Sequence, residues 1–293
     1  MKFRLRKQKK INRSRFVDFL LMALLFTVGA FMVLPLLFVI SNAFKPLDEV
    51  FLYPPKFFVR HPTLNNFVDL YHLLSASWIP FTRYLFNTFF ITAAGTAGHI
   101  FIASMAAYPL AKRKFPGKNI LFSIVVMSLM FSTQVTAIPN FMTMSWLNLI
   151  DTYWAIIVPA FGMSLGLYLM KQFMEQIPDA LLEAAQLDGC SEFRIYWSIV
   201  MPNVKPAWLT LTIFSFQSLW MISNEGASPG RLYLYSEQLK TIDYAMGQIL
   251  AGGIARVGPS MAATLILISV PILIFVFAQS RIIETMSTSG MKE

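Results

Sequence analysis

The chain has few of the residues on which disulfide-bonded domains and soluble enzymes depend. Only one of its 293 residues is a cysteine, Cys190, so an intramolecular disulfide and a cysteine metal cluster are both excluded. Lys, Arg, Asp and Glu together make up 13% of the residues, whereas 56% are hydrophobic. A soluble domain of 33.3 kDa needs far more polar surface than this. The composition therefore predicts an integral membrane protein.

Signatures of catalysis and nucleotide binding are also missing. The phosphate-binding pattern Gly-x-x-x-x-Gly-Lys-Ser/Thr does not occur, because Gly117-Lys118 is followed by Asn119 and lacks the rest. No nucleophile–base pair and no metal-ligand spacing stands out. We therefore expect no catalytic residue, no metal site and no cofactor in this chain, and its energy must come from a partner. The net charge of +9 is mostly a topology signal, aided by anionic membrane lipid, so nucleic-acid binding is not expected.

Long apolar runs dominate the sequence instead. A membrane-spanning helix needs about 20 predominantly apolar residues. The run 119–150 carries no formal charge and is longer than one span requires. Pro139 and Asn140 predict that it leaves the bilayer and continues as an interfacial helix through Trp146. We expect an all-α integral membrane protein, one domain over 1–293, with six transmembrane helices. The expected spans are approximately 17–43, 84–111, 119–142, 152–170, 206–224 and 258–280.

The basic residues predict the orientation of these spans, since Lys and Arg accumulate on the cytoplasmic side. With both termini in the cytoplasm, 17 of the 24 basic residues lie inside, including eight in the N-terminus 1–16 and four in 112–118. The reverse orientation would place the N-terminal cluster outside. The first apolar run could also indicate a signal peptide, but it is too long and no small-residue cleavage site follows. We expect an uncleaved first span.

A polar, helix-favouring insert, 177–206, separates two apolar runs and falls in a predicted cytoplasmic loop, 171–205. Pro178 suits the first position of a helix, and residues 181–186 are good helix formers. Gly189 predicts the end of this helix, because glycine adopts the left-handed conformation at low cost. The first arm of the insert is therefore a short helix that ends in a sharp turn.

The second arm of the insert is also predicted to be helical. Ser191 can cap it, and Pro202 and Pro206 are expected to end it. Between them, four apolar residues at helical spacing predict a packing stripe. These residues are Phe193, Tyr196, Trp197 and Val200.

Within the insert, Glu-Ala-Ala is followed two residues later by Asp-Gly, and an Ile and a Pro come further on. This pattern resembles the EAA motif of permease subunits in ATP-binding-cassette (ABC) importers, in the version found in carbohydrate uptake, the maltose-type second permease. Cys190 stands where that family usually has Ala, and Asn203 where it usually has Leu. The matching residues are Glu183, Ala184, Ala185, Asp188, Gly189, Ile199 and Pro202.

The resemblance implies the type I ABC importer transmembrane-domain fold, in which this loop is a coupling helix that docks in a cleft of the partner ATPase. Phe193 and Trp197 are then expected to brace the loop against the membrane spans. The residues expected to couple the chain to the ATPase are Leu181, Glu183, Ala184, Ala185, Asp188, Gly189 and Pro202.

The resemblance also implies the partners. Six spans make half a pathway, so a second homologous permease should form a heterodimer with this chain. Two copies of an ABC ATPase would bind ATP and Mg, and an extracytoplasmic solute-binding protein would deliver the substrate. The implied location is the bacterial inner membrane, with alternating access as the mechanism. The chain looks closer to permeases for polysaccharide-derived oligosaccharides, including acidic ones such as alginate fragments, than to the maltose subunit.

Two loops, 45–83 and 225–257, are expected outside the cytoplasm. Three tyrosines of the second loop could stack on sugar rings or pack against the binding protein, and both readings remain open. They are Tyr233, Tyr235 and Tyr244.

Polar residues within the spans are candidates for the translocation path, because their burial in lipid is costly. Gln134, Gln217 and Asn224 could each bond to a sugar hydroxyl or to a neighbouring helix. His99 has no nearby acidic residue, so a proton relay is not expected. Small residues around it favour close helix packing: Gly95, Gly98, Ala103 and Ala106.

Three other functions are alternatives to an importer permease. An ion-coupled secondary transporter would require carboxylates within the spans, but only Asp18 lies near one, at its edge. An importer permease for amino acids or phosphate would share the coupling loop and differ in the outer loops. A polytopic membrane enzyme would need a catalytic cluster, which the sequence does not show.

Overall fold

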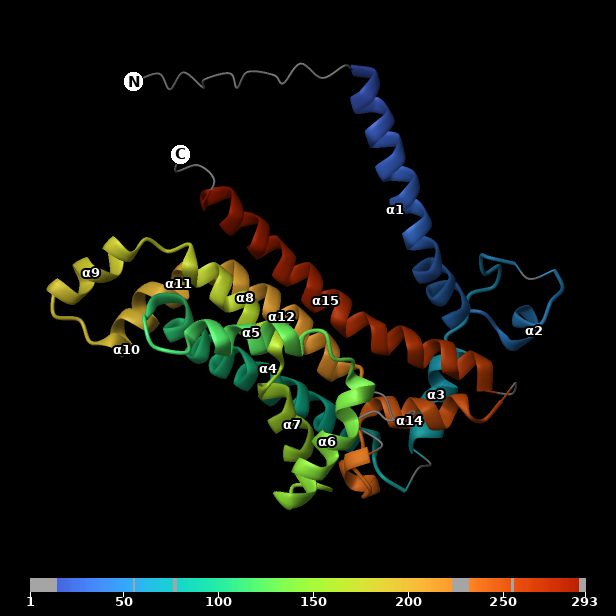
Figure 1. The fold of residues 1–293 in the computed structure, drawn as a ribbon. Helices are drawn as coiled ribbons and strands as arrows, with labels where there is room; N and C mark the ends of the chain where they lie inside the picture. The colour runs from blue at the N-terminus through green and yellow to red at the C-terminus, as the bar shows by residue number, and fades with distance from the viewer. Residues whose placement is uncertain (1–14, 55, 76–77, 223–231, 254–255, 290–293) are drawn as a thin grey trace.

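The structure is a computed structural model that describes residues 15–54, 56–75, 78–222, 232–253 and 256–289 (Figure 1). Every regular element within these ranges is a helix, which confirms the predicted all-α class. The elements form one elongated bundle from which the first helix projects.

Four helical segments in the described ranges are long and apolar enough to cross a membrane. They confirm the predicted spans 17–43, 84–111, 152–170 and 258–280. The first is α1 (Arg15–Ala43) and the second is α4 (Phe81–Lys112). The third consists of α7 (Trp154–Phe161) and α8 (Ser164–Glu175), and the fourth belongs to α15 (Val257–Ser289).

The other two predicted spans are shorter than expected. The run 119–142 is divided into α5 (Lys118–Ser128) and α6 (Thr133–Trp146). The helix predicted to continue through Trp146 is present, since Pro139 lies inside α6 and α6 ends at Trp146, but the chain also breaks earlier, at 129–132. Tight i to i+3 bonds end α5, and Ser132 is extended, with φ −75° and ψ 154°. The span 206–224 becomes α12 (Lys205–Trp220), which has 16 residues.

Helix α4 is the centre of the bundle and packs against α7, α8 and α12 (Figure 1). Small residues allow these close approaches, as predicted. A Cβ on Gly95 would lie 2.6 Å from the Leu219 side chain, and one on Gly98 would overlap the Phe161 ring. Ala103 is buried, whereas Ala106 is exposed and takes no part in this packing.

Helix α1 has the opposite character. The most apolar stretch of α1 buries none of its residues within this chain. It contacts α15 and projects away from the other helices (Figure 1). Its apolar surface is therefore left for lipid or for another subunit.

The loops gather at two opposite ends of the bundle (Figure 1). One end holds a hairpin made of α9 (Asp179–Leu187), α10 (Glu192–Ile195), the π-helical η1 (Tyr196–Val200) and α11 (Met201–Asn203). The other holds α2 (Leu47–Val50), α3 (Asn65–Ser75), η2 (Glu237–Leu239) and α14 (Ile242–Leu250). We name these the hairpin end and the outer end. The two predicted outer loops thus share one end, opposite the predicted coupling loop, as the predicted topology requires.

Candidate functional site

The turn of the hairpin is built as the sequence predicts. Helix α9 ends at Gly189, whose φ is +79°. The Gly189 N–H donates to the Gln186 carbonyl and the Cys190 N–H to the Ala185 carbonyl, both at 3.0 Å. This pair of bonds is a Schellman motif, which satisfies carbonyls at the helix end. A Cβ on Gly189 would meet nothing within 4 Å, so glycine is required here for its backbone conformation alone.

The two faces of α9 differ. Leu182 and Ala185 are buried against the rest of the chain. Leu181, Ala184 and Leu187 are exposed, Leu187 with 89% of its surface. The exposed apolar face is available to a partner. Ala185 belongs to the chain's own core, and its coupling role stays a prediction. The other predicted coupling residues, Glu183, Asp188, Gly189 and Pro202, are exposed.

The second arm of the hairpin buries a different face from the one predicted. Tyr196 and Val200 are buried, but Phe193 and Trp197 are 64% and 55% exposed. The expected bracing by Phe193 and Trp197 is therefore wrong within this chain. The buried face, which includes Ile195, Tyr196 and Val200, is rotated about the helix axis away from Phe193 and Trp197. Ile195 takes the inward position instead, fully buried.

The predicted boundaries of this second arm are right at its start and wrong at its end. Ser191 occupies the N-cap position, without a side-chain capping bond. Pro202 lies within α11 rather than after the helix. The break comes at Val204, with φ −95° and ψ 22°, and Pro206 lies in the first turn of α12. A proline is tolerated in a first turn because its missing N–H has no intrahelical partner there.

One end of α4 holds the first arm of the hairpin. The Lys112 side chain is only 6% exposed and forms an ion pair with Asp179 at 2.8 Å. The same ammonium group donates to the carbonyls of Ile177 and Glu175, the latter at 3.3 Å. Lys112 therefore fixes the chain where it enters α9.

The residue that follows α4 holds the second arm. Arg113 forms an ion pair with Glu192, the first residue of α10. The Tyr108 hydroxyl and the Gln186 amide also donate to Glu192, both at 3.0 Å. We name Lys112 and Arg113, with Asp179 and Glu192, the basic clamp. It joins both arms of the hairpin to the central helix of the bundle.

The clamp changes the titration of its carboxyl groups. The hydrogen bond from Lys112 holds the pKa of Asp179 below its usual range, and the hydrogen bond from Arg113 does the same for the pKa of Glu192. A lowered carboxyl pKa means that the attraction is complete above the ordinary carboxyl range and is lost as the pH falls through the lowered pKa. The clamp is therefore fully formed near neutral pH.

The sequence reasoning missed this clamp. It treated the basic run 112–118 only as a sign of orientation. A usable signal was present, because the insert 177–206 carries acids at positions that the same topology places on the same side of the membrane. Opposite charges on two loops at one end of a bundle predict contacts between them.

The candidates for the translocation path are separated in the structure. Gln217 is exposed on α12 and lines a cavity of about 340 Å³ between α12 and α15. Gln134 is exposed on α6 and does not line that cavity. Asn224 lies outside the described residues. The described structure therefore brings no two of these residues together.

His99 connects three segments in the middle of the bundle. It is fully buried, and its Nε2 lies 3.0 Å from the Met163 carbonyl, in the break between α7 and α8. A carbonyl can only accept, so Nε2 carries the proton. The Ser215 hydroxyl of α12 then donates to Nδ1 at 2.6 Å. His99 thus joins α4 to α12 and to the break between α7 and α8.

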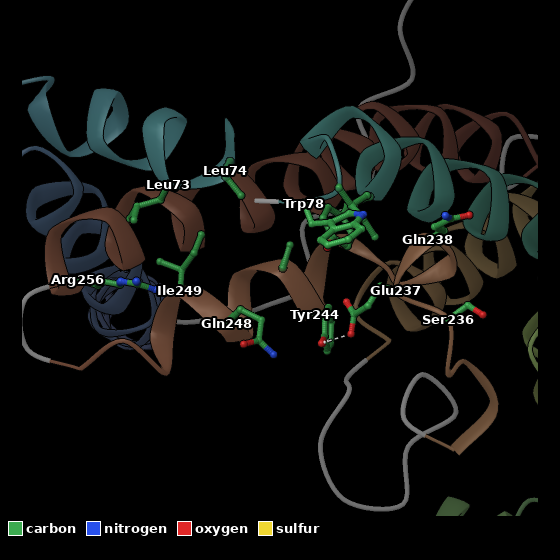
Figure 2. Close-up of a pocket in the computed structure, with 13 residues that line it drawn as sticks. Leu73, Leu74, Trp78, Ser236, Glu237, Gln238, Tyr244, Gln248, Ile249 and Arg256 are labelled. Carbon is green, nitrogen blue, oxygen red and sulfur yellow. Dashed lines mark hydrogen bonds between the residues drawn. The ribbon is translucent and has the colours of Figure 1, made fainter. Parts of the chain in front are cut away.

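The three outer tyrosines have different surroundings. Tyr233 is 2% exposed and its ring stacks on Phe141, so it lies within the chain's own core. Tyr235 is 58% exposed and stays a candidate for that contact. The Tyr244 hydroxyl donates to Glu237 at 2.6 Å, and its ring lines a cavity of about 890 Å³ (Figure 2).

Comparisons with known proteins agree with the hairpin and the fold. Protein LplC of Bacillus subtilis (strain 168) is 36% identical over 66% of this chain and 63% of its own length. The polygalacturonan/rhamnogalacturonan transport system permease protein YtcP of the same strain is 33% identical over 71% of this chain and 70% of its own length.

A solved structure has the same fold. It belongs to a bacterial ABC transporter involved in the import of the acidic polysaccharide alginate. Its TM-score is 0.74 at 22% identity, over 93% of this chain and 99% of that one. The fold is therefore that of an ABC importer transmembrane domain. A family model described as "Binding-protein-dependent transport system inner membrane component" matches residues 99–286. The chain belongs to this family of transport-system membrane components.

Proposed function

We propose that this chain, as one transmembrane domain over 1–293, is a permease subunit of an ABC importer for a sugar or oligosaccharide. It forms half of the translocation pathway and catalyses no reaction itself. ATP and Mg bind to a separate ATPase subunit, present in two copies. The observation that carries this proposal is the hairpin, which exposes an apolar face on α9 and is joined to α4 by the basic clamp.

The exposed face of α9 is suited to receive mechanical work. Moving a two-state equilibrium from 1:99 to 99:1 takes about 5.5 kcal/mol of differential binding. Fully burying one leucine side chain contributes about 1.5–3 kcal/mol. Leu181 is 43% exposed and Leu187 is 89% exposed, so burying both in a well-packed socket, together with Ala184, can supply about half of that energy. Surface ion pairs contribute less, so the apolar contact is the main one.

The clamp carries the motion into the membrane. Lys112 and Arg113 join the hairpin to α4, which packs on α7, α8 and α12. When the ATPase subunits close on ATP, the docked hairpins move with them and tilt these helices. The pathway then opens toward a loaded solute-binding protein, and hydrolysis reverses the change.

The exposed apolar helices support a second permease as the partner. The side chains of α1 are exposed along nearly its whole length, and several on α5 and α6 are also exposed. A homologous chain, in a heterodimer with this one, would cover part of this surface and lipid the rest. We place the complex in the bacterial inner membrane with both termini of this chain in the cytoplasm.

Two named proteins support an acidic oligosaccharide as the substrate. YtcP is a polygalacturonan/rhamnogalacturonan transport system permease protein, and the structurally similar transporter is involved in the import of alginate. Uptake of labelled oligogalacturonates and maltodextrins by cells that depend on this transporter tests the substrate. We expect oligogalacturonates to enter; uptake of maltodextrin alone would refute the acidic substrate and leave the sugar importer intact.

Reconstitution by omission tests the function itself. Proteoliposomes should accumulate sugar only when both permeases, the ATPase, the binding protein and MgATP are all present. Uptake by this chain alone, with or without an ion gradient, would instead support a secondary transporter.

A further inference from the structure

The outer end carries a groove that the coupling mechanism does not use. A cavity of about 890 Å³ lies between the end of α3, η2 and α14 (Figure 2). A second cavity of about 600 Å³ shares Trp78, Ile79 and Gln238 with it and continues to Arg83 and Phe86 of α4. Both volumes fall in the range of ligand sites, about 300–1,000 Å³. We name the two together the outer groove.

The floor of the outer groove is part of the protein core. Leu74, Ile79 and Ile249 line the larger cavity and are each less than 9% exposed. They belong to one buried cluster that joins α3 and α14 to α4 and α15. The floor is therefore apolar and fixed in shape.

The polar rim is also held in place. The amide of Asn87, which is fully buried, donates to the carbonyls of Gln238 and Lys240, both at 2.8 Å. Asp151 accepts from the backbone N–H groups of Tyr235 and Ser236, also at 2.8 Å. These bonds fix the turn that presents the rim residues 236–238. A rim organised before binding loses little entropy when a ligand arrives.

An indole forms the most unusual part of the wall. Trp78 lines both cavities, yet 99% of its surface is exposed. For contrast, Trp220 is 3% exposed and packed in the bundle. A flat apolar ring beside polar groups is a platform on which the C–H face of a sugar ring can stack.

The charges of the outer groove favour an anionic ligand. Figure 2 shows Arg256 at one end of the larger cavity and Glu237 toward the other. Arg83 lines the second cavity, so two guanidinium groups and one carboxylate line the outer groove. Glu237 accepts from the Tyr244 hydroxyl and raises the pKa of Tyr244 to about 12, so this phenol remains a donor. Guanidinium groups pair well with carboxylates because they donate two parallel bonds.

We propose that the outer groove is an accessory binding site for an acidic oligosaccharide. One sugar ring stacks on Trp78, uronate carboxylates face Arg256 and Arg83, and Gln238 and Gln248 bond to ring hydroxyls. This site rests on the proposed function and adds to it a place outside the membrane spans where the substrate binds this chain directly.

Calorimetry on the assembled transporter in lipid nanodiscs, without its binding protein, tests the site. The probes are pentagalacturonate and its neutral counterpart maltopentaose. We expect pentagalacturonate to bind more tightly and Trp78→Ala to weaken it about tenfold. Arg256→Gln should weaken the binding of pentagalacturonate and reduce the difference in affinity between pentagalacturonate and maltopentaose.

The matched control is Trp146→Ala, because Trp146 is 78% exposed on α6 and lines neither cavity. Equal affinities in the two tryptophan variants would overturn the site, as would equal binding of the two sugars. The affinity of the loaded binding protein, measured by ATPase stimulation, should be the same in both variants. If Trp78→Ala lowers the affinity for the binding protein and leaves the affinity for sugar unchanged, the groove binds that protein and the proposal is wrong.

The same preparations separate this site from the proposed function. Two results together support both the accessory site and the importer function. Trp78→Ala loses sugar binding, and wild-type proteoliposomes show ATP-driven uptake. If wild-type protein drives uptake but its groove binds no sugar, the accessory site fails and the importer assignment stands.

Discussion

The two ends of the molecule are fastened by different chemistry. At the outer end, two buried amides hold the loops beside the Asp151 carboxylate: Asn87 bonds to the turn at η2, and Asn66 donates to the carbonyls of Ala43 and Lys45 at 2.9 and 2.7 Å. At the hairpin end, ion pairs of the basic clamp join the loop to α4, and their carboxylates are largely exposed. Buried bonds are costly to break, whereas exposed ion pairs rearrange at little cost. The hairpin end, which we propose receives the mechanical input, is thus the more adjustable one.

The largest effect is expected at the outer end. Asn87→Leu removes the donors to two carbonyls and the acceptor of the Tyr153 hydroxyl, which donates to Asn87 at 2.7 Å. The Lys240 carbonyl and the Tyr153 hydroxyl lose their partner, whereas the Gln238 carbonyl keeps a bond from Arg83 at 3.3 Å. A buried group left unsatisfied costs about 1–3 kcal/mol, so the destabilisation should be about 2 kcal/mol or more. The thermal midpoint of the purified transporter should fall by several degrees.

The matched control for that change is Asn203→Leu, an exposed asparagine whose amide bonds to the Ile199 carbonyl in the hairpin. Its effect should stay within about 0.5 kcal/mol, as for most surface substitutions. Equal losses of stability in Asn87→Leu and Asn203→Leu would contradict the difference between the two ends.

A smaller effect on stability, with a clear effect on coupling, is expected at the clamp. Lys112→Met keeps the apolar stem but removes the donor to two carbonyls and to Asp179. ATPase activity stimulated by the loaded binding protein should persist while uptake per ATP falls. The control is Lys114→Met, an exposed lysine of the same loop, which should transport normally. An unchanged ratio of uptake to hydrolysis in Lys112→Met would show that the clamp transmits no motion.

The smallest effect should appear on acidification. Since Asp179 and Glu192 have lowered pKa values, their attraction to the clamp is lost only as the pH falls below the ordinary carboxyl range. A spin label at Leu187 should then become more mobile, whereas one at Val68 on α3, near the non-titrating amide of Asn66, should not change. Glu192→Gln should weaken the pH response at position 187. Equal responses at the two labels would contradict the difference between the ends.

Much of this architecture was predictable from the sequence, because the deciding features were local. Apolar length predicted the four long helices, and Gly189 predicted the turn, where only its backbone conformation matters. The burial of Ala185 was not predictable, because a motif does not tell which side of a short helix its own chain buries. The exposure of Phe193 and Trp197 was not predictable either, because helical spacing defines a stripe but does not tell which edge of it the bundle covers.

The missed features depend on contacts between distant segments. The clamp joins residues 67 and 79 positions apart, and the rim of the outer groove depends on Asn87, more than 150 positions from the carbonyls it holds. Tyr233 was expected at a surface because its segment reads as a loop, but tertiary packing places its ring on Phe141. Contacts between residues so far apart in the chain are not indicated by the local sequence pattern.

Co-purification of the ATPase with a Gly189→Val permease is the most direct test of the hairpin as the coupling element. Valine strains the left-handed turn without any steric clash. Gly117→Val imposes the same strain at a φ of +83°, with equal open space, in a loop outside the hairpin. We predict that Gly189→Val inserts normally but loses the ATPase and uptake, while Gly117→Val and Gly189→Asn retain both. Normal co-purification and uptake in Gly189→Val would contradict the account.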